Sequence, residues 1–476
     1  MNYFEKNTQY TQRTAIIDES GITLTYENLY EFSDIIREKL PSRSLVFSFC
    51  RNAAGSVAGY FGFLSNSIVP VLLDMHMEEE LARKLLSIYQ PAYLYLPIEM
   101  KEKFGTFPCI HEQYNYCLLQ TNYGVTHHLY QELALLLTTS GSTGSPKFVR
   151  QSYKNIQSNA ESIAQYLELD CTERPITTLP MNYTYGLSII NSHLLVGATI
   201  LMTDKTLMEK GFWEFLKKEK ATSFGGVPYT YEILKKLRFF RMDLPSLKTM
   251  TQAGGKLSPE LHKEFAEYAR EQKKHFVVMY GQTEATARMA YLPHEKSLEK
   301  YGSMGIAIPG GTFTLVDTEE KPITEPDMTG ELIYEGPNVT LGYAECIEDL
   351  EKGDERHGRL VTGDMAKMDS DGYFYIVGRK KRFLKIYGNR VNLDEIERML
   401  KGEFSEYDFA CAGQDDRLYA FVTCDREEIQ PEIRKFLAEK TGLNPKAFTI
   451  RYIEKIPKNE AGKTLYVKLE EYYDGV

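Results

Sequence analysis

The sequence predicts an α/β protein with two domains: a large N-terminal domain with parallel and mixed sheets, and a small α+β domain at the C-terminal end. Strand-like and helical patterns alternate through residues 14–74, and again through residues 221–256. Near the end of the chain, a strand pattern at residues 418–424 is followed by a helical pattern at residues 431–440. Alternating strands and helices favour a mostly parallel sheet. A chain of 476 residues is also long enough for two or three domains.

The N-terminal alternation starts with a short strand pattern at residues 14–18. The helix that we predict next follows Tyr26 and extends to Leu40, and Leu29, Phe32 and Ile36 recur in it at helical spacing. Further segments are predicted in this order: strand 45–49, a helix of small residues at 52–64 that packs closely, strand 69–74, helix 153–167 and strand 248–251. Near the C-terminal end, residues 383–391 are strand-like, and a helix begins at Leu393 with Asn392 as its cap. We expect nearly all the apolar residues of these segments to pack in a core.

Composition narrows the class of protein. Hydrophobic residues make up 43% of the chain and charged residues 26%, as in an ordinary globular protein, and no run is long enough for a membrane span. A net charge of −10 argues against non-specific nucleic-acid binding, which needs a basic surface. The seven cysteines are dispersed without a C-x-x-C pair, which is typical of reduced thiols. With no apolar signal segment at the N-terminus, we expect a cytoplasmic protein.

A loop of small residues follows the apolar run at residues 135–137. It contains, in order, Thr139, Ser140, Gly141, Ser142, Thr143, Gly144 and, after Ser145 and Pro146, Lys147. Small residues let backbone N–H groups approach a phosphate closely, hydroxyls add donors, and Lys147 adds a positive charge. A flexible linker is the alternative interpretation. The loop does not fit the Walker pattern, because Gly144 is not followed by Lys and Ser or Thr, so a P-loop ATPase is disfavoured.

This loop resembles the phosphate-binding signature of the adenylate-forming enzymes, which include acyl-CoA synthetases, adenylation domains that load peptidyl carriers, and luciferases. The resemblance implies a large adenylation domain over residues 1–380, which binds ATP and the acid. It also implies a mobile C-terminal domain over residues 381–476 that carries the catalytic lysine. Lys381 falls at the hinge about which that domain turns.

A second motif of the same family is Tyr280-Gly281-Gln282-Thr283-Glu284, at the end of a strand pattern. The resemblance implies that this stretch binds the nucleotide. Tyr280 would stack on adenine, Thr283 would hydrogen-bond near the α-phosphate and the substrate carboxylate, and Glu284 would help to hold Mg²⁺. The residue types fit these roles, because a hard cation prefers oxygen ligands and a hydroxyl can donate to an oxyanion.

The resemblance also identifies a substrate pocket. Tyr183 falls where the family places an aromatic or His beside the acyl group, and Gly254 and Gly255 fall in a turn along the adenine and the acyl pocket. The Asp that binds an α-ammonium in amino-acid-activating relatives aligns with Thr184, in a count without gaps from Gly197. A hydroxyl cannot neutralise a buried ammonium, so an acid without an α-amine is favoured.

The stretch from Gly330 to Asn338 and the pair Gly342-Tyr343 match a largely structural motif of the family. Four further residues take roles from the family's later motifs. Asp364, in Thr-Gly-Asp, is expected to accept hydrogen bonds from the ribose hydroxyls. Arg379 is expected near the ribose and phosphates. Gly388 is expected to line the tunnel for the thiol, and Lys463, in the terminal Pro-x-x-x-x-Gly-Lys loop, to be the catalytic lysine.

The implied reaction has two steps: ATP and Mg²⁺ convert a carboxylic acid to an acyl-adenylate with release of pyrophosphate, and a thiol then takes the acyl group. The favoured acceptor is CoA. The alternative is a stand-alone adenylation enzyme that loads the phosphopantetheine of a carrier protein. A third hypothesis is a non-catalytic relative that binds nucleotide as a sensor, which the presence of Lys147, Glu284, Asp364, Arg379 and Lys463 disfavours. The compact N-terminal domain favours a small or aromatic acid.

Overall fold

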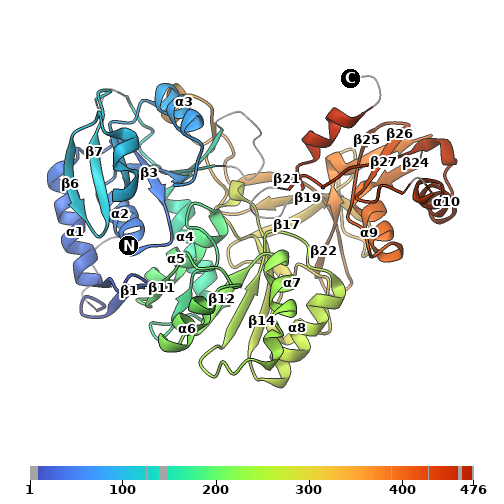
Figure 1. The fold of residues 1–476 in the computed structure, drawn as a ribbon, viewed down its shortest axis with the longest axis horizontal. Helices are drawn as coiled ribbons and strands as arrows, with labels where there is room; N and C mark the ends of the chain where they lie inside the picture. Colours follow the sequence, from blue (N-terminus) through green and yellow to red (C-terminus); the bar gives the residue numbers. More distant parts are fainter. Residues whose placement is uncertain are drawn as a thin grey trace. The chain divides into compact units, whose positions relative to one another are not determined.

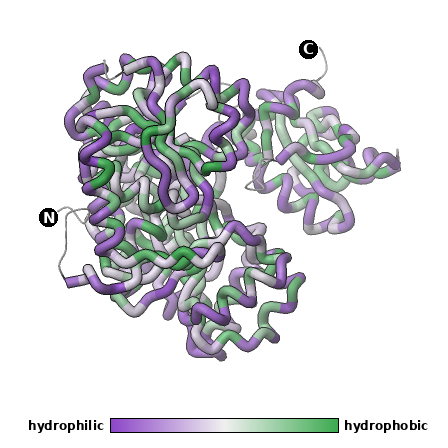
Figure 2. The backbone as a smooth tube through the Cα atoms, turned by 60° about the vertical axis from the view of Figure 1, so that its left-hand side comes forward, coloured by the Kyte–Doolittle hydropathy of each residue, from purple (hydrophilic) through white to green (hydrophobic). Residues whose placement is uncertain are grey.

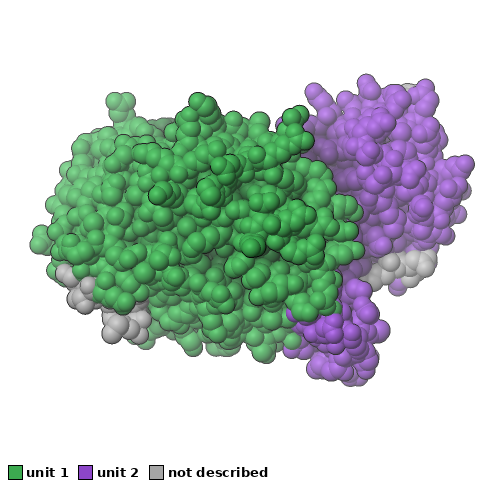
Figure 3. Space-filling view, turned by 90° about the horizontal axis from the view of Figure 1, so that it is seen from below, with its two compact units in different colours: residues 1–313, 334–360 green, residues 314–333, 361–476 purple. Residues whose placement is uncertain are grey.

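The computed structural model describes residues 9–124, 127–138, 147–387, 389–426, 428–458 and 464–473. The chain divides into two compact units, which Figure 3 shows in two colours. Unit 1 comprises residues 1–313 and 334–360, and unit 2 comprises residues 314–333 and 361–476.

Unit 1 contains an eight-stranded sheet with the order β20-β9-β8-β4-β3-β5-β7-β6. Its central strands β8, β4, β3 and β5 run parallel, and antiparallel strands extend it at both sides. The bounds are β3 Leu45–Cys50, β4 Val69–Asp74, β5 Tyr93–Pro97, β6 Cys109–Gln113, β7 Tyr116–Gln120, β8 Leu133–Thr138, β9 Phe148–Ser152 and β20 Gly342–Ala344.

A nine-stranded sheet, β16-β15-β14-β13-β12-β10-β11-β1-β2, forms the other sheet of unit 1 (Figure 1). Its strands are β1 Thr14–Asp18, β2 Thr23–Thr25, β10 Pro175–Ile176, β11 Ile200–Met202, β12 Ser223–Gly226, β13 Thr249–Gln252, β14 His275–Tyr280, β15 Ala290–Tyr291 and β16 Ile306–Ala307. Strands β12, β13 and β14 are parallel and in register, with Gly226 beside Gln252 and Gln252 beside Val278. Their carboxyl ends therefore meet at one edge, where open α/β sheets bind ligands.

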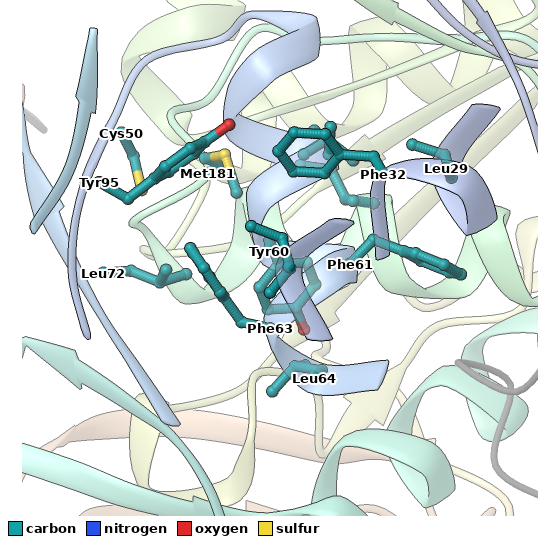
Figure 4. Packing of buried hydrophobic residues seen from close by; sticks show 14 of the residues in the cluster. Leu29, Phe32, Cys50, Tyr60, Phe61, Phe63, Leu64, Leu72, Tyr95 and Met181 are labelled. Carbon is teal, nitrogen blue, oxygen red and sulfur yellow. The ribbon is translucent and has the colours of Figure 1, made fainter. Parts of the chain in front are cut away.

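Two helices contribute many residues to one buried core of unit 1. Helix α1 (Tyr26–Lys39) begins with a capping box formed by Thr25 and Asn28, and helix α2 (Ala54–Ser65) is buried from Ala54 to Leu64. Figure 4 shows Phe32 of α1 and Phe61 and Phe63 of α2 among the buried residues of this core, and Gly62 of α2 faces Phe32 and Ile36 of α1. The small residues of α2 permit this close packing, as the sequence predicted.

The other helices of unit 1 are amphipathic or lie in the interior. They are α3 Glu79–Tyr89, α4 Tyr153–Tyr166, α5 Thr184–Leu195, α6 Lys210–Lys218, α7 Pro228–Lys236 and α8 Pro259–Glu271. In Figure 2 the outer helices alternate between hydrophobic and hydrophilic residues along their length, whereas α5 is buried from Thr184 to Leu194. No helix in the described ranges is long and apolar enough to cross a membrane.

Unit 2 contains most of a five-stranded sheet, β18-β17-β19-β21-β22, and a C-terminal α+β part. The sheet consists of β17 Thr312–Val316, β18 Pro322–Ile323, β19 Thr329–Glu335, β21 Arg359–Met368 and β22 Phe374–Arg379. The C-terminal part consists of the hairpin β23 Phe383–Ile386 and β24 Asn389–Asn392, the sheet β25 Phe409–Gln414, β26 Arg417–Val422 and β27 Phe448–Tyr452, and helices α9 Leu393–Glu403 and α10 Ile429–Thr441.

The predicted fold class is confirmed, with one local correction. Residues 383–391, which the sequence suggested as one strand, form the hairpin β23–β24, and the chain turns at Tyr387 with a φ of 48°. Asn392 caps α9 as predicted, because its side chain accepts a hydrogen bond from the backbone N–H of Asp394. The boundary between residues 380 and 381 stays a prediction.

Candidate active site

The nucleotide motif lies at the carboxyl end of β14, as its sequence context suggested. Gly281 is required there, because a Cβ atom would lie 1.6 Å from the carbonyl oxygen of Ala287. Gln282 donates a hydrogen bond of 3.2 Å to the hydroxyl of Tyr280. This bond holds the hydroxyl end of the side chain that we expect to stack on adenine. Thr283 opens the short 3₁₀ turn Thr283–Ala285 and is buried.

Glu284 contacts Tyr343, a residue for which the sequence suggested only a structural role. The Tyr343 hydroxyl donates a hydrogen bond of 2.7 Å to Glu284 Oε1. Lys147 Nζ lies 3.7 Å from the centroid of the Tyr343 ring, and the Arg356 guanidinium lies 4.6 Å from it. The predicted phosphate lysine and the predicted metal ligand are therefore joined through one aromatic residue, whose ring contacts two cations.

The protonation state of Tyr343 supports this arrangement. Burial, together with the neighbouring Glu284 carboxylate, raises the pKa of the phenol to about 12, so it remains a donor at neutral pH. Glu284 is half-buried and makes no ion pair with any described residue. A site with one carboxylate suits Mg²⁺, because substrate phosphates and water usually supply the other oxygen ligands of this ion. The described residues hold no cluster of three metal-ligating side chains that would suit a metal bound by the protein alone.

Replacing Tyr343 by phenylalanine tests this contact. The variant keeps the ring beside the two cations and loses the interactions of the hydroxyl, which are the hydrogen bond that orients the Glu284 carboxylate and the contact with Arg356. We expect the Mg²⁺ concentration for half-maximal pyrophosphate release to rise about tenfold, as for other partners of metal ligands. At saturating Mg²⁺ the KM for ATP should stay unchanged, and a changed KM there would show that the hydroxyl does not act through the metal ligand.

The turn after Glu284 is strained and is supported by Asn338. Thr286 and Ala287 have φ angles of 56° and 110°, which are unfavourable for residues with a Cβ atom. Asn338 is 2% exposed, and its amide nitrogen donates to the carbonyls of Ala285 (2.8 Å) and Arg288 (3.0 Å). Its oxygen accepts from the hydroxyl of Tyr334 at 2.8 Å. One buried amide thus holds both ends of the turn.

We expect replacement of Asn338 by leucine to destabilise unit 1. The change leaves the Ala285 carbonyl and the Tyr334 hydroxyl without their partner in a buried place and removes one of the two side-chain donors to the Arg288 carbonyl. This loss costs about 3 kcal/mol or more in unfolding free energy. The measurement is the urea midpoint of the full chain. The matched variant Tyr334→Phe removes only one of these hydrogen bonds and should lower the midpoint less. Equal midpoints for Asn338→Leu and the unaltered chain would exclude the supporting role.

The predicted acyl-pocket residues lie together at the same sheet edge. Gly254 has a φ of 81°, and a Cβ atom on it would lie 2.6 Å from the Tyr183 hydroxyl and 3.0 Å from Val227 Cγ1. Gln252 holds this turn by donating to the carbonyl oxygens of Ala253 (3.2 Å) and Gly255 (2.9 Å). The packing of Tyr183 on Gly254 agrees with their prediction as neighbours in the pocket. Thr184 is the first residue of α5 and is buried.

In unit 2 the structure brings together the two residues that we expect near the ribose. Asp364 and Arg379 are directly opposite each other on β21 and β22. Arg379 Nε lies 2.8 Å from Asp364 Oδ1, and the Asp364 side chain is 4% exposed, against 55% for Arg379. The paired strands hold the carboxylate in a fixed position and leave the guanidinium partly in solvent.

The predicted hinge residue lies between two anchored neighbours. Lys380 Nζ lies 2.7 Å from Glu331 Oε2, on β19. Arg382 is buried, and its guanidinium contacts Asp394 at 2.7 Å and Glu397 at 2.6 Å, both on α9. Lys381 itself is exposed. The side chains before and after it are thus attached to different elements.

Several predicted site residues lie outside the described residues. They are Thr139, Ser140, Gly141, Ser142, Thr143 and Gly144 of the phosphate loop, Gly388 of the thiol tunnel and the catalytic lysine Lys463. Their roles stay predictions.

The site also contains residues that sequence reasoning missed. Arg356 donates to the carbonyl oxygen of Glu284 at 3.0 Å and to the Thr340 hydroxyl at 2.7 Å, and Tyr343 and Asn338 act as described above. All come from residues 334–360, which return to unit 1 after a separate stretch of chain. The available signals were the stretch from Gly330 to Asn338 and the Gly-Tyr pair at residues 342–343, which match a motif that we expected to be largely structural.

Comparison with known proteins identifies the family of this chain. The model of a family of enzymes described as AMP-binding matches residues 3–344. The chain therefore belongs to the AMP-binding enzyme family.

Two individual relatives are each less than 30% identical to this chain. A 4-coumarate–CoA ligase-like protein of Arabidopsis thaliana is 28% identical over 350 residues, which are 70% of this chain and 60% of the relative. A 2-succinylbenzoate–CoA ligase of Bacillus licheniformis is 27% identical over 348 residues, which are 71% of this chain and 70% of the relative. The match thus spans about three-fifths of the length of the Arabidopsis relative and of several others.

Solved structures show the same fold. The o-succinylbenzoate CoA synthetase MenE of Bacillus subtilis, solved with AMP, has a TM-score of 0.79 at 20% identity and covers 98% of each chain. MatB of Rhodopseudomonas palustris, solved with ATP, has a TM-score of 0.79 at 18% identity and covers 100% of this chain and 99% of its own.

Proposed function

We propose that this chain activates a carboxylic acid with ATP and then transfers the acyl group to the thiol of CoA. The observation that supports this most is the contact of Glu284 with Tyr343, whose ring lies under Lys147. It places a candidate metal ligand and a candidate phosphate lysine together at the carboxyl end of β14. The family and the CoA-ligase names of several relatives agree with this activity.

In the first step a carboxylate oxygen of the acid attacks the α-phosphorus of ATP. The bond from that phosphorus to the bridging oxygen breaks, and pyrophosphate leaves. Both reactants are anions, so the barrier depends on neutralisation and alignment. Lys147 would hold the β- and γ-phosphates, Thr283 would donate to the α-phosphate, and Lys463 would bridge the carboxylate and the α-phosphate. Mg²⁺, held by Glu284, would supply charge neutralisation for the departing pyrophosphate.

In the second step the thiol sulfur attacks the acyl carbon, the bond from that carbon to the phosphate oxygen breaks, and AMP leaves. The thiol gives up its proton, and Lys463 is no longer needed. We infer that the chain turns at Lys381 between the steps. The ion pairs of Lys380 with Glu331 and of Arg382 with α9 support a pivot at the residue between them.

The test is pyrophosphate release, dependent on ATP and Mg²⁺, across a panel of short, long-chain, aryl and amino acids. Hydroxylamine traps the adenylate in one set of wells, and CoA is present in a parallel set. We expect at least one acid to give hydroxamate and to turn over faster with CoA. A hit without a CoA effect would overturn CoA as the acceptor and indicate a carrier protein. No release with any acid, despite ATP binding, would overturn the proposed activity.

A further inference from the structure

A buried arginine lies on the acyl side of unit 1. Arg288 follows the strained turn after Glu284 and is 2% exposed. Its Nε donates to the Ser188 hydroxyl at 3.1 Å, and its Nη1 contacts the Tyr166 hydroxyl at 3.0 Å and Met279 Sδ at 3.3 Å. The guanidinium also lies 5.2 Å from the centroid of the Tyr185 ring. Each of these partners is an uncharged side chain.

The guanidinium has no anionic partner among the described residues. No carboxylate lies within ion-pair distance of it, and its Nη2 makes no hydrogen bond in the described part of the chain. Burial raises the pKa of Tyr166 and the pKa of Tyr185, so neither phenol supplies a negative charge at neutral pH. A buried charge is ordinarily paired, because leaving water is costly for an ion.

The surroundings of Arg288 are those of the predicted acyl pocket. Tyr185 and Met279, which contact the arginine, belong to one apolar cluster with Val227 and Ala253, and Tyr183 packs against it. Tyr183 in turn lies against Gly254. The residues that we expect to bind phosphate, Lys147 and the loop before it, are a separate set. An anion that pairs with Arg288 would therefore belong to the acyl part of the substrate.

We propose that Arg288 binds a second carboxylate of the substrate, so that the acid which this enzyme activates is a dicarboxylic acid. One carboxylate would react at the α-phosphorus, and the other would accept hydrogen bonds from the guanidinium. Arginine suits this task, because its planar fork matches a carboxylate and its charge does not depend on pH. Ser188 and Tyr166 hold the fork and leave Nη2 for the ligand. This inference rests on the proposed function.

The test compares dicarboxylic acids with monocarboxylic acids of matched chain length, by hydroxamate formation and by kcat/KM. It uses the full chain and the variants Arg288→Met and Arg288→Lys. The matched control is Arg174→Met, because Arg174 is an arginine of unit 1 that has its own carboxylate partner, Glu219, at 3.1 Å. Melting temperatures of all variants show whether they are folded.

We expect the unaltered chain to prefer the dicarboxylic member of the best pair. Arg288→Met should lower kcat/KM for that acid about thirtyfold or more, as for loss of one partner of a buried charge pair, and should leave the matched monocarboxylic acid little changed or improved. Arg288→Lys should keep part of the preference, and Arg174→Met should keep all of it.

Two results would overturn the inference while the proposed function stands. One is a preference of the unaltered chain for monocarboxylic acids. The other is an equal loss for both acids of a pair in folded Arg288→Met. If Arg288→Met does not fold, two other results test the inference. They are the preference of the unaltered chain for the dicarboxylic acid and the part of this preference that Arg288→Lys keeps. Absence of hydroxamate with every acid would instead refute the proposed function.

Discussion

Replacing Lys463 by alanine is expected to lower the rate of acyl-adenylate formation by about a hundredfold to a thousandfold. The first step brings two anions together, and the lysine would place a positive charge where charge develops between the carboxylate and the α-phosphate. The second step does not need this charge. Thioester formation from supplied acyl-adenylate and CoA should therefore proceed at nearly the unaltered rate, as measured by rapid quench.

The variant Lys381→Pro is the counterpart of Lys463→Ala. Proline restricts the backbone at the exposed residue between anchored Lys380 and anchored Arg382. We expect near-normal pyrophosphate release and slowed thioester formation. If Lys463→Ala slowed both half-reactions equally, or if Lys381→Pro slowed only the first, the assignment of roles in this domain would be wrong.

Replacing Glu284 by glutamine is expected to reduce pyrophosphate release by about a hundredfold at millimolar Mg²⁺. Glutamine can still accept the hydrogen bond from Tyr343, so the variant removes the negative charge and keeps the shape. A raised Mg²⁺ requirement, measured by titration, would identify the loss as one of metal binding.

The control for Glu284→Gln is Glu335→Gln, which removes a carboxylate of unit 1 that is 55% exposed. It should leave the Mg²⁺ titration unchanged. If Glu284→Gln shifts neither the rate nor the Mg²⁺ requirement, Glu284 is not the metal ligand.

The fold was largely predictable because its local signals are strong. Helix α1 has regular apolar spacing and a capping box, and β14 ends in the stretch from Tyr280 to Glu284 that fixes its place in the sheet. Parallel strands bring their carboxyl ends to one edge, so Gly254 and Glu284 could be expected on the same side of the sheet. The hairpin at Tyr387 was missed because a four-residue strand carries too little pattern to show a reversal.

The parts of the site that were not predictable depend on contacts between distant segments. Tyr343 reaches Glu284 because β20 pairs with β9, which no local pattern indicates. The supporting role of Asn338 can be inferred only from its three buried hydrogen-bond partners, which the sequence does not reveal. Arg288 reads as an ordinary charged residue in the sequence, and only its burial without an anion makes it a candidate for binding substrate.

The most direct test of the central claim is the fate of a heavy oxygen isotope placed in the substrate carboxylate. If the acid is joined to AMP through one of its own oxygens, the AMP formed with the thioester carries one labelled oxygen, and pyrophosphate carries none. Mass spectrometry of the products decides this in a single turnover. Label in AMP is the result that we predict. Unlabelled AMP, or label in inorganic phosphate with ADP as the nucleotide product, would contradict activation through an acyl-adenylate.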